Sequence, residues 1–115
     1  MIDKQTAEHF PWGDNCDGWH LARTSALSVI EQRMPPDTVE DRHYHKHAHQ
    51  FFYVIEGVLI MEVDQNEFSL SAGQGIEVTE GSSHHVSNRS TSDVRFLVIS
   101  NPPTQGDRIL VDSRM

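Results

Sequence analysis

Short extended segments, each followed by turn residues, dominate this sequence between residues 26 and 100. The apolar or alternating runs cover residues 26–34, 51–56, 58–64, 67–70, 75–79 and 94–99. None of the longer stretches in this region keeps the 3.6-residue period of an amphipathic helix. Many short strands spaced by about 8–12 residues, with glycine or proline between them, indicate an antiparallel all-β barrel or sandwich.

The length of 115 residues predicts a single domain. We expect the barrel to span residues 26–100, after an N-terminal extension (residues 1–25) that packs on the barrel or on a dimer partner. Residues 101–115 form a C-terminal tail in this division, and residues 1–12 are expected to include a helical turn. A homodimer is expected, because small barrels often pair through sheet edges.

The charge balance is acidic, with 17 Asp and Glu against 9 Lys and Arg and a net charge of −8. Nucleic acid and anionic membranes are therefore not expected as partners, since binding to phosphate needs an electropositive face. Residues 1–8 lack the apolar core of a signal peptide, and no stretch approaches the roughly 18 apolar residues of a membrane span. Cys16 is the single cysteine, which excludes an intramolecular disulfide. We expect a cytoplasmic protein with a small-molecule substrate.

Histidines form the most informative chemical pattern. Six of the eight lie in two clusters, the segment 43–49 and the pair 84–85. Neutral imidazole is the commonest protein ligand of metal ions. Residues i and i+2 of a strand point to the same face about 7 Å apart, so a His-x-His pair can bind one ion. The first cluster contains three overlapping pairs of this kind, and composition alone does not choose among them.

The spacing around one of these pairs resembles a known motif. His43-x-His45, four further residues, Gln50, six further residues and Gly57 match the first signature of the cupin family. That signature has two histidines, a glutamate or sometimes a glutamine, and a glycine at these intervals. Only the pair 43/45 has the usual spacing to both Gln50 and Gly57.

A second segment resembles the other cupin signature. It runs from Gly73 through Gly81 to His84 and Asn88 with the family's spacing, and it departs only at Thr79, where proline is usual. That position belongs to a turn and not to a ligand. The two motifs occur in the family's order, and the resemblance covers roughly residues 26 to 100.

The resemblance implies a cupin β-barrel, the double-stranded β-helix or jelly roll, around one divalent metal ion (Ni, Zn, Mn or Fe). The implied ligands are His43, His45, Gln50 and His84. His47 and His49 are expected near the barrel mouth as solvent-exposed or loop residues, and His85 is expected to point away from the site.

Gln50 suggests the type of chemistry. A neutral amide in place of a carboxylate leaves the full charge on the ion, which makes it a stronger Lewis acid and disfavours redox cycling. We therefore expect an isomerase, cyclase or lyase acting on a small oxygen-rich metabolite. The ligand pattern and size resemble small cupins that process sugar-derived keto acids and some polyketide cyclases. A non-heme dioxygenase and a non-catalytic binding barrel are the alternatives.

Lewis-acid chemistry also needs a group that moves a proton. The main candidates are Glu31 as a base, Arg33 as the group that binds an anion, and Tyr53. The segment 26–34 leaves its inward face open: either the odd-numbered residues, including Glu31 and Arg33, or the even-numbered ones face the interior. Further candidates for the proton-transfer role are Tyr44, His49 and Glu62.

Overall fold

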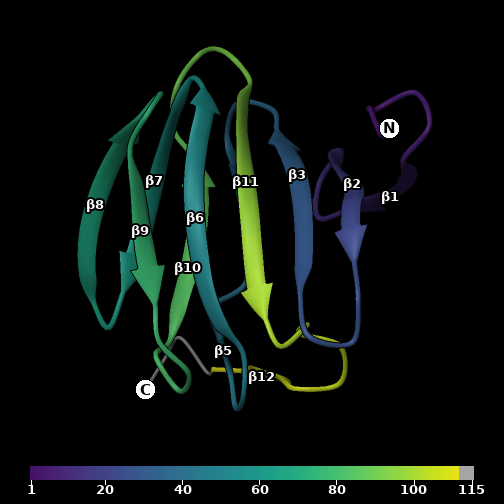
Figure 1. The fold of residues 1–115 in the computed structure, drawn as a ribbon. Coiled ribbons are helices and arrows are strands. Elements are labelled where there is room, and N and C mark those ends of the chain that lie inside the picture. The colour runs from purple at the N-terminus through teal and green to yellow at the C-terminus, as the bar shows by residue number, and fades with distance from the viewer. Residues whose placement is uncertain (112–115) are drawn as a thin grey trace.

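Two antiparallel sheets pack face to face in the computed structural model, which describes residues 1–111 (Figure 1). The first sheet has the order β1-β2-β3-β11-β6-β9 and faces the viewer in Figure 1. The second has the order β12-β5-β10-β7-β8, with β4 also paired to β10. This arrangement confirms the expected all-β jelly roll.

The strands of the first sheet are β1 (Glu8–Trp12), β2 (Cys16–Arg23), β3 (Ser28–Met34), β6 (His49–Glu56), β9 (Gly75–Val78) and β11 (Val94–Asn101). Those of the second are β4 (Thr38–Val39), β5 (His43–His45), β7 (Val58–Val63), β8 (Asn66–Ser71), β10 (His84–Asn88) and β12 (Arg108–Leu110). All six extended segments expected from the sequence are strands, with ends shifted by a few residues.

Gly57 makes the tight connection between β6 and β7. Its φ is +86°, and a Cβ on this residue would lie 2.6 Å from the carbonyl oxygen of Asp93. Only glycine meets both conditions without strain. This connection aligns β6 in the front sheet with β7 in the sheet behind it.

The register of β3 shows which of its faces points inward. Ile30 lies opposite Val98 of β11, which lies opposite Phe52 of β6, and residues directly opposite one another share a face. Phe52 and Val98 belong to the buried core, as does Met34 at the end of β3. The even-numbered residues of β3 therefore face the interior, and the odd-numbered ones face outward.

The N-terminal residues differ from expectation. A single backbone turn forms where the N–H of Ala7 donates to the carbonyl of Asp3 at 2.8 Å, but β1 follows at once. Strand β1 pairs with β2, and β2 pairs with β3, so residues 8–23 continue the front sheet. The expected helical turn is thus confined to the residues before Glu8, because edge pairing with β2 holds the rest extended.

The C-terminal part also pairs with the barrel. Strand β12 lies antiparallel to β5, with Arg108 opposite His45 and Leu110 opposite His43. Figure 1 shows both strands at the lower end of the molecule. Residues 1–111 contain no helix that is long and apolar enough to cross a membrane.

Candidate metal centre

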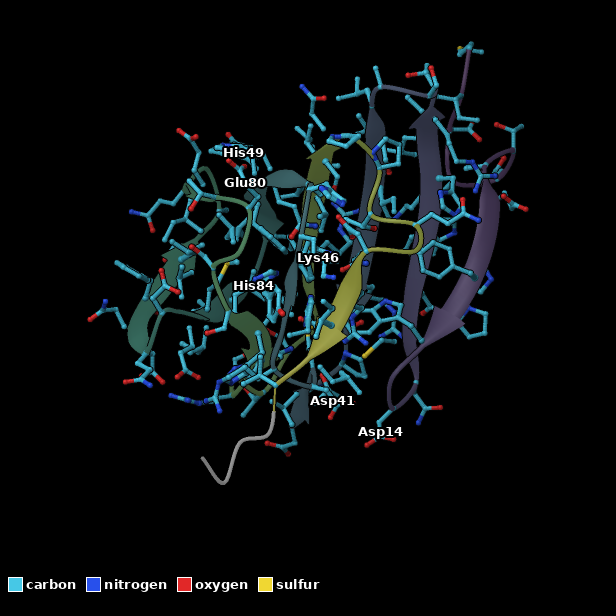
Figure 2. All side chains as sticks on the ribbon, turned by 90° about the horizontal axis from the view of Figure 1, so that it is seen from below. Asp14, Asp41, Lys46, His49, Glu80 and His84 are labelled. Atoms are coloured by element: carbon cyan, nitrogen blue, oxygen red, sulfur yellow. The ribbon has the colours of Figure 1, made fainter. Side chains whose placement is uncertain are left out.

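Strands β5 and β10 bring three histidines together inside the barrel. His43 and His45 project from one face of β5, and His84 of β10 lies directly opposite His43. The ring centroids are 4.4 Å apart for His43 and His84, 5.0 Å for His43 and His45, and 5.7 Å for His45 and His84. One ring nitrogen from each lies within 4.8 Å of the others, and all three side chains are buried. Figure 2 shows His84 from below, between the two layers.

The other ring nitrogen of each histidine has an acceptor. The Nδ1–H of His43 donates to the carbonyl of Asp41 at 2.8 Å, and that of His84 donates to the carbonyl of Ser82 at 3.0 Å. The Nδ1–H of His45 donates to the carboxylate of Asp107 at 2.8 Å. These bonds leave Nε2 as the lone-pair nitrogen of each ring. The Nε2 atom of His84 is buried and has no hydrogen-bond partner among residues 1–111.

Gln50 projects from the start of β6 into the same interior. Its side chain is buried, and its amide nitrogen donates to the hydroxyl of Ser100 at 3.1 Å. Its Oε1 is buried and accepts no hydrogen bond from the described residues. A buried polar atom without a partner is costly in a folded protein, so Gln50 Oε1 and His84 Nε2 each need a ligand to satisfy them.

Burial keeps the imidazoles in the neutral form that binds metals. It lowers the pKa of His43 to about 3 and that of His84 to about 4. Burial also lowers the pKa of His45, and the hydrogen bond to Asp107 opposes that effect. A neutral imidazole donor set is thus ready for a cation across the physiological pH range.

Sequence reasoning missed Asp107. Its carboxylate also accepts hydrogen bonds from the backbone N–H groups of His47, at 3.1 Å, and Ala48, at 3.0 Å. Burial alone would raise the pKa of Asp107, but the bonds from His45 and from these N–H groups outweigh it and lower the pKa. No local pattern marks a lone aspartate 62 residues beyond its partner. Its position becomes evident only once β12 is paired with β5.

The donor set fits a divalent transition metal. Three imidazole nitrogens and an amide oxygen suit Zn, Ni, Mn or Fe, whereas calcium and magnesium prefer sites made of oxygen alone. His43, His45, His84 and Gln50 are the residues that would hold the ion. A carboxylate behind one histidine is the usual means of fixing the tautomer of a metal ligand.

The remaining histidines of the two clusters lie elsewhere. His47 is exposed, and His49 pairs with Glu77 at 2.6 Å and with Glu80 at 3.6 Å. Figure 2 shows His49 and Glu80 together at the edge of the molecule, apart from His84. His85 pairs with Glu62 at 3.0 Å on the outer side of β10.

The structure does not bring Glu31, Arg33 and Tyr53 to the histidines. All three lie on the outer face of the front sheet, where Leu97 stands between Glu31 and Tyr53. Glu31 is buried there against Lys4, at 3.1 Å, although it faces away from the barrel interior. The guanidinium of Arg33 binds Asp17 at 2.7 Å and Asp93 at 3.1 Å. The contacts of Glu31 and Arg33 are those of an ion-pair network on the outer face of the sheet. The ring of Tyr53 stacks there on that of Phe51.

A cavity of about 510 Å³ adjoins the centre on the Nδ1 side of His43. Its lining includes Glu40 and Arg108. A terminal nitrogen of Arg108 approaches His43 Nδ1 to 3.4 Å, and a carboxylate oxygen of Glu40 lies 3.9 Å from the same atom. Burial raises the pKa of Glu40 to about 7, against the attraction of Arg108. Sequence reasoning singled out neither residue.

Comparison of the sequence with known families identifies the family to which this chain belongs. The family model described as the cupin domain matches residues 30–100. The tetracenomycin polyketide synthase protein TcmJ of Streptomyces glaucescens is 31% identical over 81 residues, which are 70% of this chain and 53% of that protein. The chain thus spans about half the length of this curated relative.

Solved structures agree on the fold. KdgF from a Halomonas species superposes with a TM-score of 0.84 at 16% identity, covering 91% of this chain and 94% of that one. The polyketide cyclase RemF of Streptomyces resistomycificus superposes with a TM-score of 0.80 at 14% identity, covering 98% of this chain and 87% of that one.

Proposed function

Because the chain belongs to the cupin family, we propose that it is a metal-dependent enzyme that isomerises, cyclises or cleaves a small oxygen-rich metabolite. The ion would be divalent and held by His43, His45, His84 and Gln50. When bound, it would act as a Lewis acid that polarises a carbonyl or hydroxyl oxygen of the substrate. We propose this chemistry in preference to oxygen activation.

One observation carries the proposal: the three histidines converge, and two polar atoms of the candidate ligands are buried without a partner. One ring nitrogen of each histidine lies within 4.8 Å of the others, and neither His84 Nε2 nor Gln50 Oε1 has a hydrogen-bond partner among residues 1–111. A barrel without a metal would be expected to pair these polar atoms with one another or fill the space with apolar side chains. Neither arrangement is found.

The residues around the candidate ion favour Lewis-acid chemistry over oxygen activation. Gln50 contributes a neutral oxygen, and the two carboxyl groups close to the ligands, those of Asp107 and Glu40, lie at the Nδ1 atoms of His45 and His43 and not at the ligand position. Negative charge therefore stays one residue away from the ion. This arrangement favours polarisation of a substrate oxygen over stabilisation of a higher oxidation state.

The names of two similar proteins support a choice of substrate class. One is named as a polyketide synthase protein and another as a polyketide cyclase. We propose a poly-β-keto chain as the substrate, which enolises and closes to a phenolic ring with loss of water. A keto sugar acid is the alternative within the same chemistry, because it presents a carbonyl and adjacent hydroxyls to the same ion.

The test is turnover by metal-loaded protein. Purified protein is loaded in turn with zinc, nickel, manganese and iron, and incubated with a synthetic β-polyketone and with a keto uronate. Products are followed by mass spectrometry while oxygen consumption is recorded. Conversion without oxygen uptake, lost in His84→Ala and kept in His47→Ala, is expected. Stoichiometric oxygen uptake with the iron form would overturn the Lewis-acid proposal in favour of a dioxygenase.

A further inference from the structure

One arginine among residues 1–111 lacks the carboxylate partner that the other arginines have. Arg23, Arg33, Arg42, Arg89 and Arg95 each pair with at least one carboxylate. Arg108 is the exception within residues 1–111, since no carboxylate oxygen lies within 4.0 Å of its guanidinium. In a chain with a net charge of −8, an arginine without such a partner is unusual, and this one lines the cavity beside the candidate metal centre.

Two aromatic rings form another wall of the cavity. Phe10 lies directly against Gly18 of β2, where a side-chain Cβ would overlap the phenyl ring. Trp12 lies on the same strand, and its indole N–H donates to the carbonyl of Asp17 at 2.9 Å. Both rings are therefore held in place by β2 and present apolar surface to the cavity.

The polar lining has two kinds of group. The side-chain amide of Gln32, on the inward face of β3, makes no hydrogen bond with residues 1–111. Asp14 and Asp41 are exposed members of the lining, and Figure 2 shows both on the same side of the molecule. Carboxylates accept hydrogen bonds from hydroxyl groups, whereas Arg108 donates to an anionic oxygen.

We infer that this cavity binds a flat hydroxylated aromatic acid. Its acidic oxygen pairs with Arg108, its ring packs on Trp12 and Phe10, and its hydroxyl groups donate to Asp14 and Asp41. The ligand should carry only one anionic group. Arg108 is the one basic residue in the lining, and a second anion would face the carboxyl groups of Asp14, Glu40 and Asp41. The inference goes beyond the proposed function, because the cavity lining contains none of the four candidate metal ligands and meets His43 from its Nδ1 side, whereas Nε2 is the nitrogen that would bind the ion.

Binding of a defined probe tests the inference. β-Resorcylate, an aromatic acid with two hydroxyl groups, is titrated into metal-free and zinc-loaded protein by calorimetry. We expect Arg108→Met to weaken binding at least tenfold, since a charge-assisted hydrogen bond is lost, and Arg89→Met to bind as the wild type does. Equal affinity of the wild type and Arg108→Met would overturn the assignment of Arg108.

Two substitutions of Trp12 test the contribution of the aromatic side of the cavity. Trp12→Leu is expected to lose most of the affinity and Trp12→Phe to keep most of it. Resorcinol, which lacks the acid group, and glucuronate, which lacks the ring, are both expected to bind more weakly than β-resorcylate. Tighter binding of glucuronate, or equal binding by the two Trp12 variants, would overturn the choice of an aromatic ligand.

Metal content separates this inference from the proposed function. Each variant is analysed for bound metal beside the titration, because Arg108 also approaches His43. Arg108-dependent binding of the probe by a protein that takes up no metal would retain the cavity site and reject the metal-dependent enzyme. Stoichiometric metal without probe binding would reject the cavity site and leave the metal centre intact.

Discussion

The carboxylate of Asp107 accepts a hydrogen bond from Nδ1 of His45 at 2.8 Å. The same carboxylate accepts the backbone N–H groups of His47 and Ala48, which follow β5. One residue of the segment after β11 thus fixes both the ring of a metal ligand and the turn beyond it. The C-terminal part of the chain is therefore a component of the candidate centre.

Asp107→Asn is expected to weaken metal binding. The amide keeps the size of the side chain, but it removes the negative charge that holds the Nδ1–H tautomer of His45. Changes of this kind cost about 10–100-fold in metal affinity. Competition with a fluorescent zinc chelator measures the effect. Asp93→Asn, which removes a carboxylate paired with Arg33 at the surface, should leave the affinity unchanged. Equal affinities of both variants would contradict the role of Asp107.

Gln50→Glu is expected to raise metal affinity and lower turnover. A carboxylate adds negative charge to the ligand set, which strengthens binding of the cation and reduces its power as a Lewis acid. Gln50→Leu should instead weaken binding, since it offers no donor. Chelator competition and the turnover assay applied to both variants distinguish these effects. Faster turnover in Gln50→Glu would count against the Lewis-acid proposal.

Gly57→Ala and Gly73→Ala should differ in stability although both residues have a φ of +86°. The positive φ alone costs about 1–2 kcal/mol for alanine. A Cβ at residue 73 meets nothing within 4 Å, whereas one at residue 57 lies 2.6 Å from the carbonyl of Asp93. Urea unfolding should therefore show a larger loss for Gly57→Ala. Equal losses of unfolding free energy would contradict this, because they would mean that the backbone around Asp93 shifts to admit the Cβ without a measurable loss of stability.

The outer-face ion pairs predict a dependence of stability on pH. Hydrogen bonds from His9 and Arg33 hold the pKa of Asp17 below its usual value. A carboxyl group with a lowered folded-state pKa contributes stability that is complete above its unfolded pKa, roughly 3.9, and is lost as the pH falls toward the folded value. Asp17→Asn should lower the unfolding free energy near pH 6 and flatten its decline toward pH 3. Asp37→Asn, in an exposed turn, is the control, and a similar acid decline in wild type and Asp17→Asn would contradict the assignment.

The fold and the histidine cluster were predictable because they rest on local spacing. Gly57, the pair His43 and His45, and His84 each belong to a motif of fixed intervals, and the short strands follow from alternation and turn residues. The structure then groups the three histidines as those intervals imply.

The surroundings of the cluster were not predictable, because they depend on long-range pairing. Asp107 and Arg108 reach the site only through β12 on β5, and Phe10 and Trp12 reach the cavity only through β1 on β2. The inward face of β3 was undecided for a related reason. Glu31 is buried on the outer face by Lys4 and Arg95, so burial on this strand does not alternate as it would on a sheet with one solvent-facing side.

The presence of the metal ion can be measured by elemental analysis of protein purified without affinity resin or added metal. The wild type is measured beside His84→Ala, with His47→Ala as the matched control from the exposed part of the first cluster. We expect about one equivalent of zinc, nickel or manganese in the wild type and in His47→Ala, and none in His84→Ala. No metal in the wild type, before or after dialysis against these ions, would contradict it.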